Sequence, residues 1–269
     1  MAIGPLLLGA LYAAGSYTSF ALFKASSAGA VFFPPAGLTL AALVMSERRR
    51  WPMLLATIAA VEVLVDVSQG QALPYVFGFA LANTLEPLTG AWLLTRRWPR
   101  SAPGTKRGGL EMWSFVTRAV VLGPIIGATI GTATVVWGLQ KGSWGSVFGP
   151  FWAGDALAVL TLGGGILAWW STDPDRRLPG ARCVVAVCAV VVGCTVVGYW
   201  PSGTPLFYVP LPIIVAAGVR YRSPVLAFLA GSVMSITANL VSVLGYGPWA
   251  TVAERPHYGL ATLQTSQGR

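Results

Sequence analysis

The chain has 269 residues, of which 55% are hydrophobic and only 10% are charged, and its formal net charge is +9. Ordinary soluble domains carry about a quarter charged residues. This composition excludes a soluble globular enzyme, a disordered chain and a disulfide-stapled secreted module. It predicts an all-α fold, a polytopic transmembrane helical bundle.

Nine apolar segments follow one another along the chain and predict about nine membrane spans. They cover residues 3–23, 31–45, 52–67, 72–95, 112–138, 147–170, 181–200, 206–219 and 224–246. The second, third and eighth are shorter than the roughly 20 residues that cross a bilayer comfortably. We expect these three to be thin, broken or buried against neighbouring helices, and Pro210 and Pro212 favour an irregular eighth span.

The distribution of the basic residues predicts the orientation. One set of alternate loops holds thirteen of them, at positions 48–50, 96, 97, 100, 106, 107, 176, 177, 182, 220 and 222, against three in the opposite loops. The positive-inside rule then places the N-terminus in the cytoplasm. Topology accounts for the net charge, so we expect membrane lipid and no nucleic acid as a partner. Nine spans divide the chain into an integral membrane domain over 1–246 and a tail over 247–269, which is extracytoplasmic or precedes a tenth helix.

Ionisable and strongly polar groups inside the predicted spans are candidate site residues, because they are costly to hold in hydrocarbon. They are Glu62, Asp66, Asn83, Glu86, Arg118, Asp155 and Asn239. The spacing of Glu62 and Asp66, and that of Asn83 and Glu86, places each pair on one helix face. At 1.5 Å per residue, five of the seven groups fall at or outside the membrane midplane. This predicts an outward-facing polar pocket.

The charge balance of this pocket is unusual, because four acids face one base. They cannot all be ionised and unpaired in a low-dielectric site, so some are expected to be protonated, hydrogen-bonded, open to water or paired with a cation. We expect a structural ion pair between Glu86 and Arg118. Two plainer readings stay open: Glu62 and Asp66 could face water beside a thin span, and Asp155 could be an interhelical contact.

Several other patterns indicate structure rather than chemistry. Gly123, Gly127 and Gly131 form a small-residue face that predicts close packing within the chain, or else a homodimer interface. The three cysteines, at positions 183, 188 and 194, lie in one apolar run without metal-ligand spacing. Phosphate-loop, zinc-protease and serine-hydrolase motifs do not occur. We therefore expect no enzyme activity within this chain, no cofactor and no metal site.

Four segments together resemble a known family. They are FFPPAGLTLAAL at 32–43, ALANTLEPLTGAWLLTRR at 80–97, PFWAGDALAVL at 150–160 and LFYVPLPIIVAAGVRY at 206–221. Their order and spacing are similar to those of the type-one membrane-associated sensor domains of the MASE family. The resemblance spans residues 30–245. It implies a multi-pass sensory module of the bacterial inner membrane, joined to a histidine kinase or a cyclic-di-GMP enzyme.

The family pattern falls on Pro34, Pro35, Gly37, Asn83, Glu86, Trp152, Gly154 and Asp155. Together with the residues chosen by burial cost, this gives the candidate ligand-binding residues Pro34, Pro35, Glu62, Asp66, Asn83, Trp152, Asp155 and Asn239. The chain departs from the pattern at Phe33, where the family often has tryptophan, and at Pro87, where it often has a small residue. We expect the final helix and the output domain of the family to lie outside residues 1–269.

The resulting hypothesis is a sensory, ligand-binding bundle for an unknown small ligand. It passes a signal to a cytoplasmic signalling domain or partner protein. Two alternatives belong to other classes. The first is a small transporter or membrane substrate-binding subunit whose buried carboxylates carry protons or cations. The second is a structural subunit of a membrane assembly.

Overall fold

The structure is a computed structural model and describes residues 4–25, 32–97, 108–138, 140, 142–200 and 208–246. Within these ranges the regular structure is helical and contains no strand. The helices of the described ranges form nine continuous rods, not counting one isolated helical turn, and each rod overlaps one of the predicted spans. The all-α prediction is therefore confirmed. The predicted tail at 247–269 lies outside the described residues.

Two compact units make up the chain, a division that the hydrophobic pattern of the sequence does not reveal. Unit 1 comprises Met1–Ser19 and Phe33–Gly164, and unit 2 comprises Phe20–Phe32 and Gly165–Arg269. Two continuous rods, α1 and the rod that ends in α8, contribute residues to both units.

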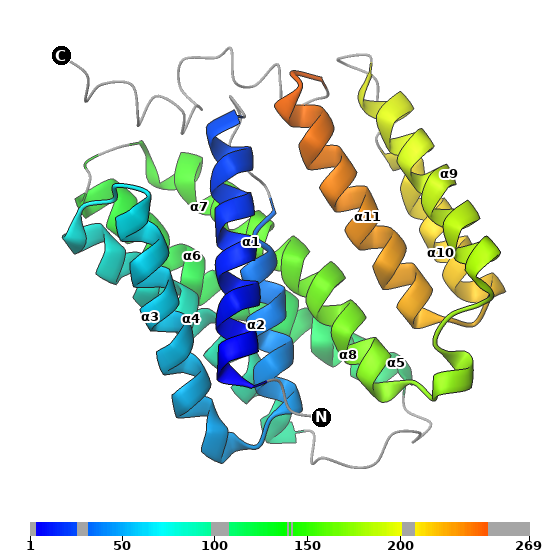
Figure 1. Ribbon diagram of the computed structural model, residues 1–269, viewed down its shortest axis with the longest axis horizontal. Coiled ribbons are helices and arrows are strands. Elements are labelled where there is room, and N and C mark those ends of the chain that lie inside the picture. Colours follow the sequence, from blue (N-terminus) through cyan, green and yellow to red (C-terminus); the bar gives the residue numbers. More distant parts are fainter. Residues whose placement is uncertain are drawn as a thin grey trace. The chain divides into compact units, whose positions relative to one another are not determined.

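The helices of unit 1 come first in the chain (Figure 1). They are α1 (Pro5–Ala25), α2 (Pro34–Met45), η1 (Arg48–Arg50), α3 (Trp51–Ser68), α4 (Leu73–Arg97), α5 (Gly108–Phe115), η2 (Val116–Leu122), α6 (Gly123–Ala133), η3 (Thr134–Gly138), α7 (Trp144–Ala158) and η4 (Val159–Gly163). Of these, η2, η3 and η4 are π-helical stretches inside longer rods. α4 packs against both α3 and α6, and so stands at the centre of the unit.

Unit 2 contains α8 (Gly164–Ser171), the short turn η5 (Pro174–Arg176), α9 (Ala181–Tyr199), α10 (Pro210–Arg220) and α11 (Pro224–Val243). α9, α10 and α11 pack against one another. Ser223 caps α11 by accepting a hydrogen bond from the Leu226 amide at 3.0 Å, and its hydroxyl donates to the carbonyl of Arg177. The two basic loops of this unit are thereby joined at one end of it.

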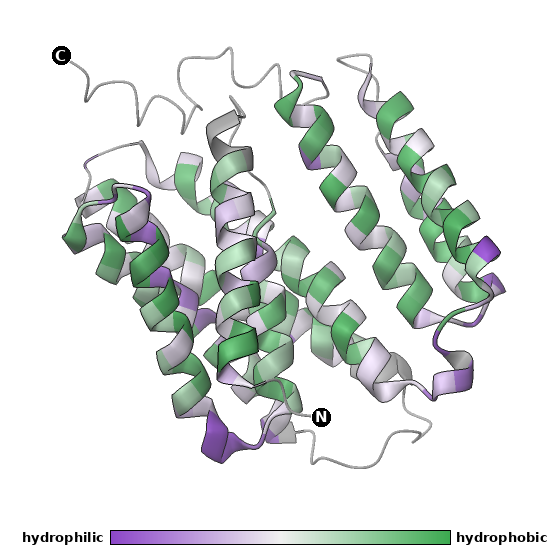
Figure 2. Cartoon of the chain, viewed as in Figure 1, coloured by the Kyte–Doolittle hydropathy of each residue, from purple (hydrophilic) through white to green (hydrophobic). Residues whose placement is uncertain are grey.

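The lengths of the helices suit a membrane protein. Among the described residues, five helices are long and apolar enough to cross a membrane: Arg48–Ser68, Met112–Gly138, Trp144–Ser171, Ala181–Tyr199 and Pro224–Val243. Hydrophobic residues predominate along the helices, and a strongly hydrophilic stretch lies at η1, where α3 begins (Figure 2). α2 and α10 are short, as expected. The third span was predicted too short, because η1 extends α3 by one turn.

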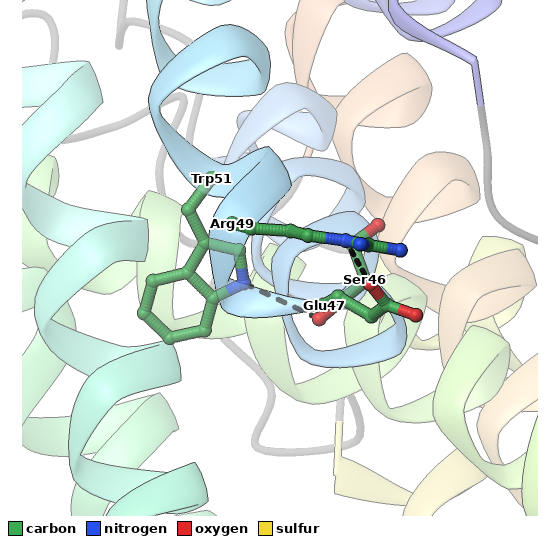
Figure 3. A network of polar contacts seen from close by, with 4 residues as sticks. All are labelled: Ser46, Glu47, Arg49 and Trp51. Atoms are coloured by element: carbon green, nitrogen blue, oxygen red, sulfur yellow. Dashed lines mark hydrogen bonds and ion pairs between the residues drawn. The ribbon is translucent and has the colours of Figure 1, made fainter.

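In the connection between α2 and α3, a tryptophan at the end of a span forms hydrogen bonds within the protein. Trp51 is buried, and its indole N–H donates to the carbonyl of Leu43 at 2.8 Å and to that of Ser46 at 3.4 Å. Next to it Arg49 and Glu47 form an ion pair (Figure 3). The last carbonyls of a helix lack partners within the helix, so Trp51 completes the end of α2.

Candidate functional site

Six buried residues of unit 1 form one group, here named the carboxyl cluster: Tyr12, Glu62, Asp66, Asn83, Glu86 and Asp155. They come from α1, α3, α4 and α7. Every member is at most 8% exposed. The alternative in which Glu62 and Asp66 face water is therefore wrong: they are 4% and 1% exposed.

The first half of the cluster lies between α1, α3 and α4. Asn83 donates a hydrogen bond through Nδ2 to Oε1 of Glu62. The Tyr12 hydroxyl lies beside the same carboxyl group, and Asp66 follows Glu62 one turn along α3. α1 is brought to this level by Gly9, where an added Cβ would lie 3.3 Å from a methyl group of Thr57. A small residue on α1 thus places an aromatic hydroxyl against a buried acid.

The second half joins α4 to α7. The carboxyl groups of Glu86 and Asp155 lie next to one another, and both residues are 2% exposed. The plainer reading of Asp155 as an interhelical contact is thus supported. Gly127 of α6 provides the space for Glu86, since a Cβ on Gly127 would lie 2.5 Å from Oε2 of Glu86.

Within the cluster, one polar oxygen on each residue is buried and forms no close, well-aligned hydrogen bond, although the Tyr12 hydroxyl lies beside the Glu62 carboxyl group and the Glu86 and Asp155 carboxyl groups lie next to one another. These atoms are Tyr12 Oη, Glu62 Oε2, Asp66 Oδ2, Asn83 Oδ1, Glu86 Oε1 and Asp155 Oδ2. Buried polar atoms normally have partners, which makes this group of atoms a candidate site for a proton or a cation. The described residues hold no group of three or more His, Cys, Asp or Glu side chains arranged for a metal ion.

The expected Glu86–Arg118 ion pair does not form: in the described ranges the ion pair is that of Arg49 with Glu47. The register of two antiparallel helices explains the difference. Gly90 of α4 lies against Ala119, whereas Glu86 lies against Gly127. Arg118 therefore lies level with the residues of α4 that follow Gly90, and not with Glu86. Nine residues separate it from Gly127, about 13 Å along a helix.

The Phe33–Pro34–Pro35 segment lies beside the cluster rather than within it. The rings of Phe33 and Tyr12 meet edge to face at 6.4 Å. The amide of Phe33 donates to the carbonyl of Gly154 at 3.5 Å. A Cβ on Gly15 of α1 would lie 3.1 Å from the ring of Pro35. The two prolines open α2, where a missing N–H costs nothing, and so set its start between α1 and α7.

Gly37 determines how closely α2 approaches the rod that carries Asp155. A Cβ on Gly37 would lie 2.8 Å from the amide nitrogen of Gly163 and 2.9 Å from the carbonyl carbon of Ala158. Backbone meets backbone here, next to the π-helical stretch η4. The PPAG segment is therefore a packing device that holds the rod with Asp155 in place.

Trp152 and Asn239 also differ from the expected arrangement. The indole N–H of Trp152 donates to the carbonyl of Val121 in η2 at 3.2 Å, so this side chain joins α7 to the neighbouring π-helical stretch. Asn239 belongs to unit 2, and its side-chain amide donates to the carbonyl of Ser235 at 2.9 Å. Neither observation assigns these residues to the carboxyl cluster.

The glycine face of the fifth span is used within the chain. Gly123 and Gly127 pack against α4, and a Cβ on Gly131 would lie 2.6 Å from the ring of Phe151. All three glycines are buried. This face is therefore occupied by contacts within the chain, as the packing alternative expected.

Tyr12 was not expected from the sequence, because the candidates there were the charged and amide groups that are costly to hold in hydrocarbon. A signal was available in its neighbours. Leu8, Tyr12 and Ser16 recur every four residues and are all at most 1% exposed. A buried stripe of this kind that contains two hydroxyl groups indicates a polar contact with another helix.

Comparison with known proteins agrees with this picture. The family model MASE1 matches residues 4–253, which is most of the chain and includes every member of the carboxyl cluster. Neither a curated protein nor a solved structure matches. The chain belongs to the MASE1 family of membrane-associated sensor domains.

Proposed function

We propose that this chain is the sensory module of a bacterial inner-membrane signalling protein, with the carboxyl cluster as its input site. The single observation that carries this proposal is the burial of four carboxyl groups in unit 1 without a basic partner among the described residues. Residues that only hold helices together need no such expensive groups. A signal that changes the proton or ligand content of the cluster changes the contacts among α1, α3, α4 and α7.

The rod formed by α7, η4 and α8 offers a route for that change. Asp155 lies on it eight residues before Gly163, where η4 ends, and α8 continues the same rod into unit 2. π-helical stretches inside α-helices are often found at functional sites. A shift of the rod at Asp155 would therefore be carried along one continuous helix, and from there to a cytoplasmic kinase or cyclic-di-GMP enzyme. Catalysis in this proposal belongs to that output partner and not to the membrane helices.

The test is the activity of the attached output enzyme in native membranes. Asp155→Asn is expected to change the basal output at least about fivefold, the lower end of typical coupling between sites. Asp175→Asn is the matched control, since Asp175 is an exposed carboxyl in the short turn η5. Equal output from the wild type and Asp155→Asn, at equal protein levels, would count against the proposal.

The transporter alternative is distinguished by the same variants. The observation that favours it is again the buried carboxyl cluster, since such groups carry ions in transporters. Uptake of radiolabelled sodium by vesicles, lost in Asp155→Asn while the output stays unchanged, would favour transport. A changed output without any uptake favours the sensor.

A further inference from the structure

The first half of the carboxyl cluster has the chemistry of a cation site. Its atoms without a close hydrogen bond are Oη of Tyr12, Oε2 of Glu62, Oδ2 of Asp66 and Oδ1 of Asn83. All four are oxygens, which are the ligands that hard cations prefer. The four residues are between 1% and 8% exposed, so the atoms are shielded from bulk water.

The hydrogen bond between Asn83 and Glu62 orients this set. Because the amide nitrogen of Asn83 donates to one carboxyl oxygen of Glu62, its carbonyl oxygen is left as an acceptor. The second oxygen of Glu62 forms no close hydrogen bond either, although the Tyr12 hydroxyl lies beside the same carboxyl group. The hydrogen bond thus leaves one acceptor atom on each of its two partners.

Among the described residues, no basic side chain forms an ion pair with Glu62 or Asp66. Glu62 and Asp66 lie one turn apart on α3, and Arg118 stands too far along its own rod to neutralise them. In the second half of the cluster, Glu86 and Asp155 face each other, and one shared proton can join two such carboxyl groups. In the first half the groups that bond to the Glu62 carboxyl are an amide and a phenol, and the second acid, Asp66, lies one turn away on the same helix.

We propose that Tyr12, Glu62, Asp66 and Asn83 bind a sodium ion. A monovalent ion fits better than a divalent one, because calcium takes six to eight oxygens and magnesium keeps a demanding octahedral shell. The set supplies four side chains, of which two are carboxylates. The inference rests on the proposed function in taking the carboxyl cluster as the input site, and it names the input.

Sodium-dependent stability of the full chain in lipid nanodiscs tests the site. The midpoint of thermal unfolding is followed by tryptophan fluorescence at fixed pH, with sodium chloride replacing choline chloride at constant ionic strength. A ligand that binds the native state raises this midpoint. We expect a saturable rise for the wild type and for Glu47→Gln, an exposed acid at the end of α2.

The site variants give the sharper result. Glu62→Gln is expected to lose the sodium-dependent rise. Tyr12→Phe removes one neutral ligand and keeps the ring against Phe33, so it should need about tenfold more sodium for the same rise. Tyr12→Phe carries the test if Glu62→Gln does not fold.

Two results would overturn the sodium site. One is an unfolding midpoint of the wild type that is equal in sodium and in choline at every pH. This includes the case in which pH alone shifts the midpoint, since protons rather than sodium then occupy the cluster. The other is an undiminished rise in both variants. Because no output is measured, either result leaves the proposed function standing, whereas an output insensitive to Asp155→Asn overturns that function and leaves sodium binding intact.

Discussion

Asn83 of α4 donates a hydrogen bond to the carboxyl group of Glu62 on α3, and both residues are buried. This contact ties the central helix of unit 1 to its neighbour. Asn83→Ala leaves the Glu62 carboxyl without its donor, so we expect the free energy of unfolding to fall by about 1–3 kcal/mol.

Thr84→Ala is the matched control on the same helix, since the Thr84 hydroxyl bonds only back to the carbonyl of Ala80. Thermal unfolding in nanodiscs compares the two variants. Equal unfolding midpoints would show that the Asn83–Glu62 contact does not stabilise the unit.

The packing of Glu86 against Gly127 predicts a strong effect of a single methyl group. Gly127→Ala would place a Cβ 3.0 Å from the Cβ of Glu86, and overpacking of this kind costs about 1–3 kcal/mol. Gly193→Ala in α9 meets nothing within 4 Å, and should be neutral or stabilising by up to about 1 kcal/mol. The midpoints of thermal unfolding should separate the two, and a harmless Gly127→Ala would contradict the described register of α4 and α6.

Gly37 should be still less tolerant of alanine. An added Cβ there meets backbone atoms of Gly163 and Ala158 rather than the end of a side chain, and backbone cannot move aside without shifting a whole helix. We expect Gly37→Ala to lower the unfolding midpoint more than Gly127→Ala does, and also to shift the basal output. A smaller effect than that of Gly127→Ala would mean that α2 does not hold the rod of Asp155.

Much of the fold could be predicted from the sequence, because long apolar runs with a biased distribution of arginine fix the number and the order of the helices. Burial cost likewise identified Glu62, Asp66, Asn83, Glu86 and Asp155 as one group of polar residues. What these arguments cannot supply is register. The Glu86–Arg118 pair was wrong because residue spacing along one helix does not say which turn of the next helix it meets.

Positions that depend on packing were harder to assign for the same reason. Trp152 was expected to bind the ligand, but its indole N–H donates a hydrogen bond to the carbonyl of Val121. Tyr12 was not expected, because only the approach of α1 to α3 at Gly9 places it beside Glu62. In both cases the deciding fact is a contact between helices that are far apart in the sequence.

The indole of Trp152 yields its own prediction. Trp152→Phe removes the donor to Val121, and should lower the free energy of unfolding by about 1 kcal/mol. It should leave the sodium-dependent rise in place, because the ring joins α7 to η2 and does not bind the ion. A loss of the sodium response as complete as that in Glu62→Gln would instead place the indole in the site.

In unit 2, Ser223 is expected to be the residue that fixes the start of α11. Ser223→Ala removes both the cap of the Leu226 amide and the bond to the Arg177 carbonyl, a loss of about 1–2 kcal/mol. Ser171→Ala, at an exposed position whose hydroxyl bonds to Ala168 at 3.4 Å, should change little. Proteolysis of the loop near Arg177 should become faster in Ser223→Ala but not in Ser171→Ala.

The most direct test of the carboxyl cluster as input site is a scan in which each buried or exposed acid is neutralised in turn. The response measured is the output of the native signalling complex in membranes moved from choline to sodium chloride. Glu62→Gln, Asp66→Asn, Glu86→Gln and Asp155→Asn should each abolish or shift that response. Glu47→Gln, Asp173→Asn and Asp175→Asn, all at exposed positions, should keep it. Buried and exposed variants that respond alike would contradict the account.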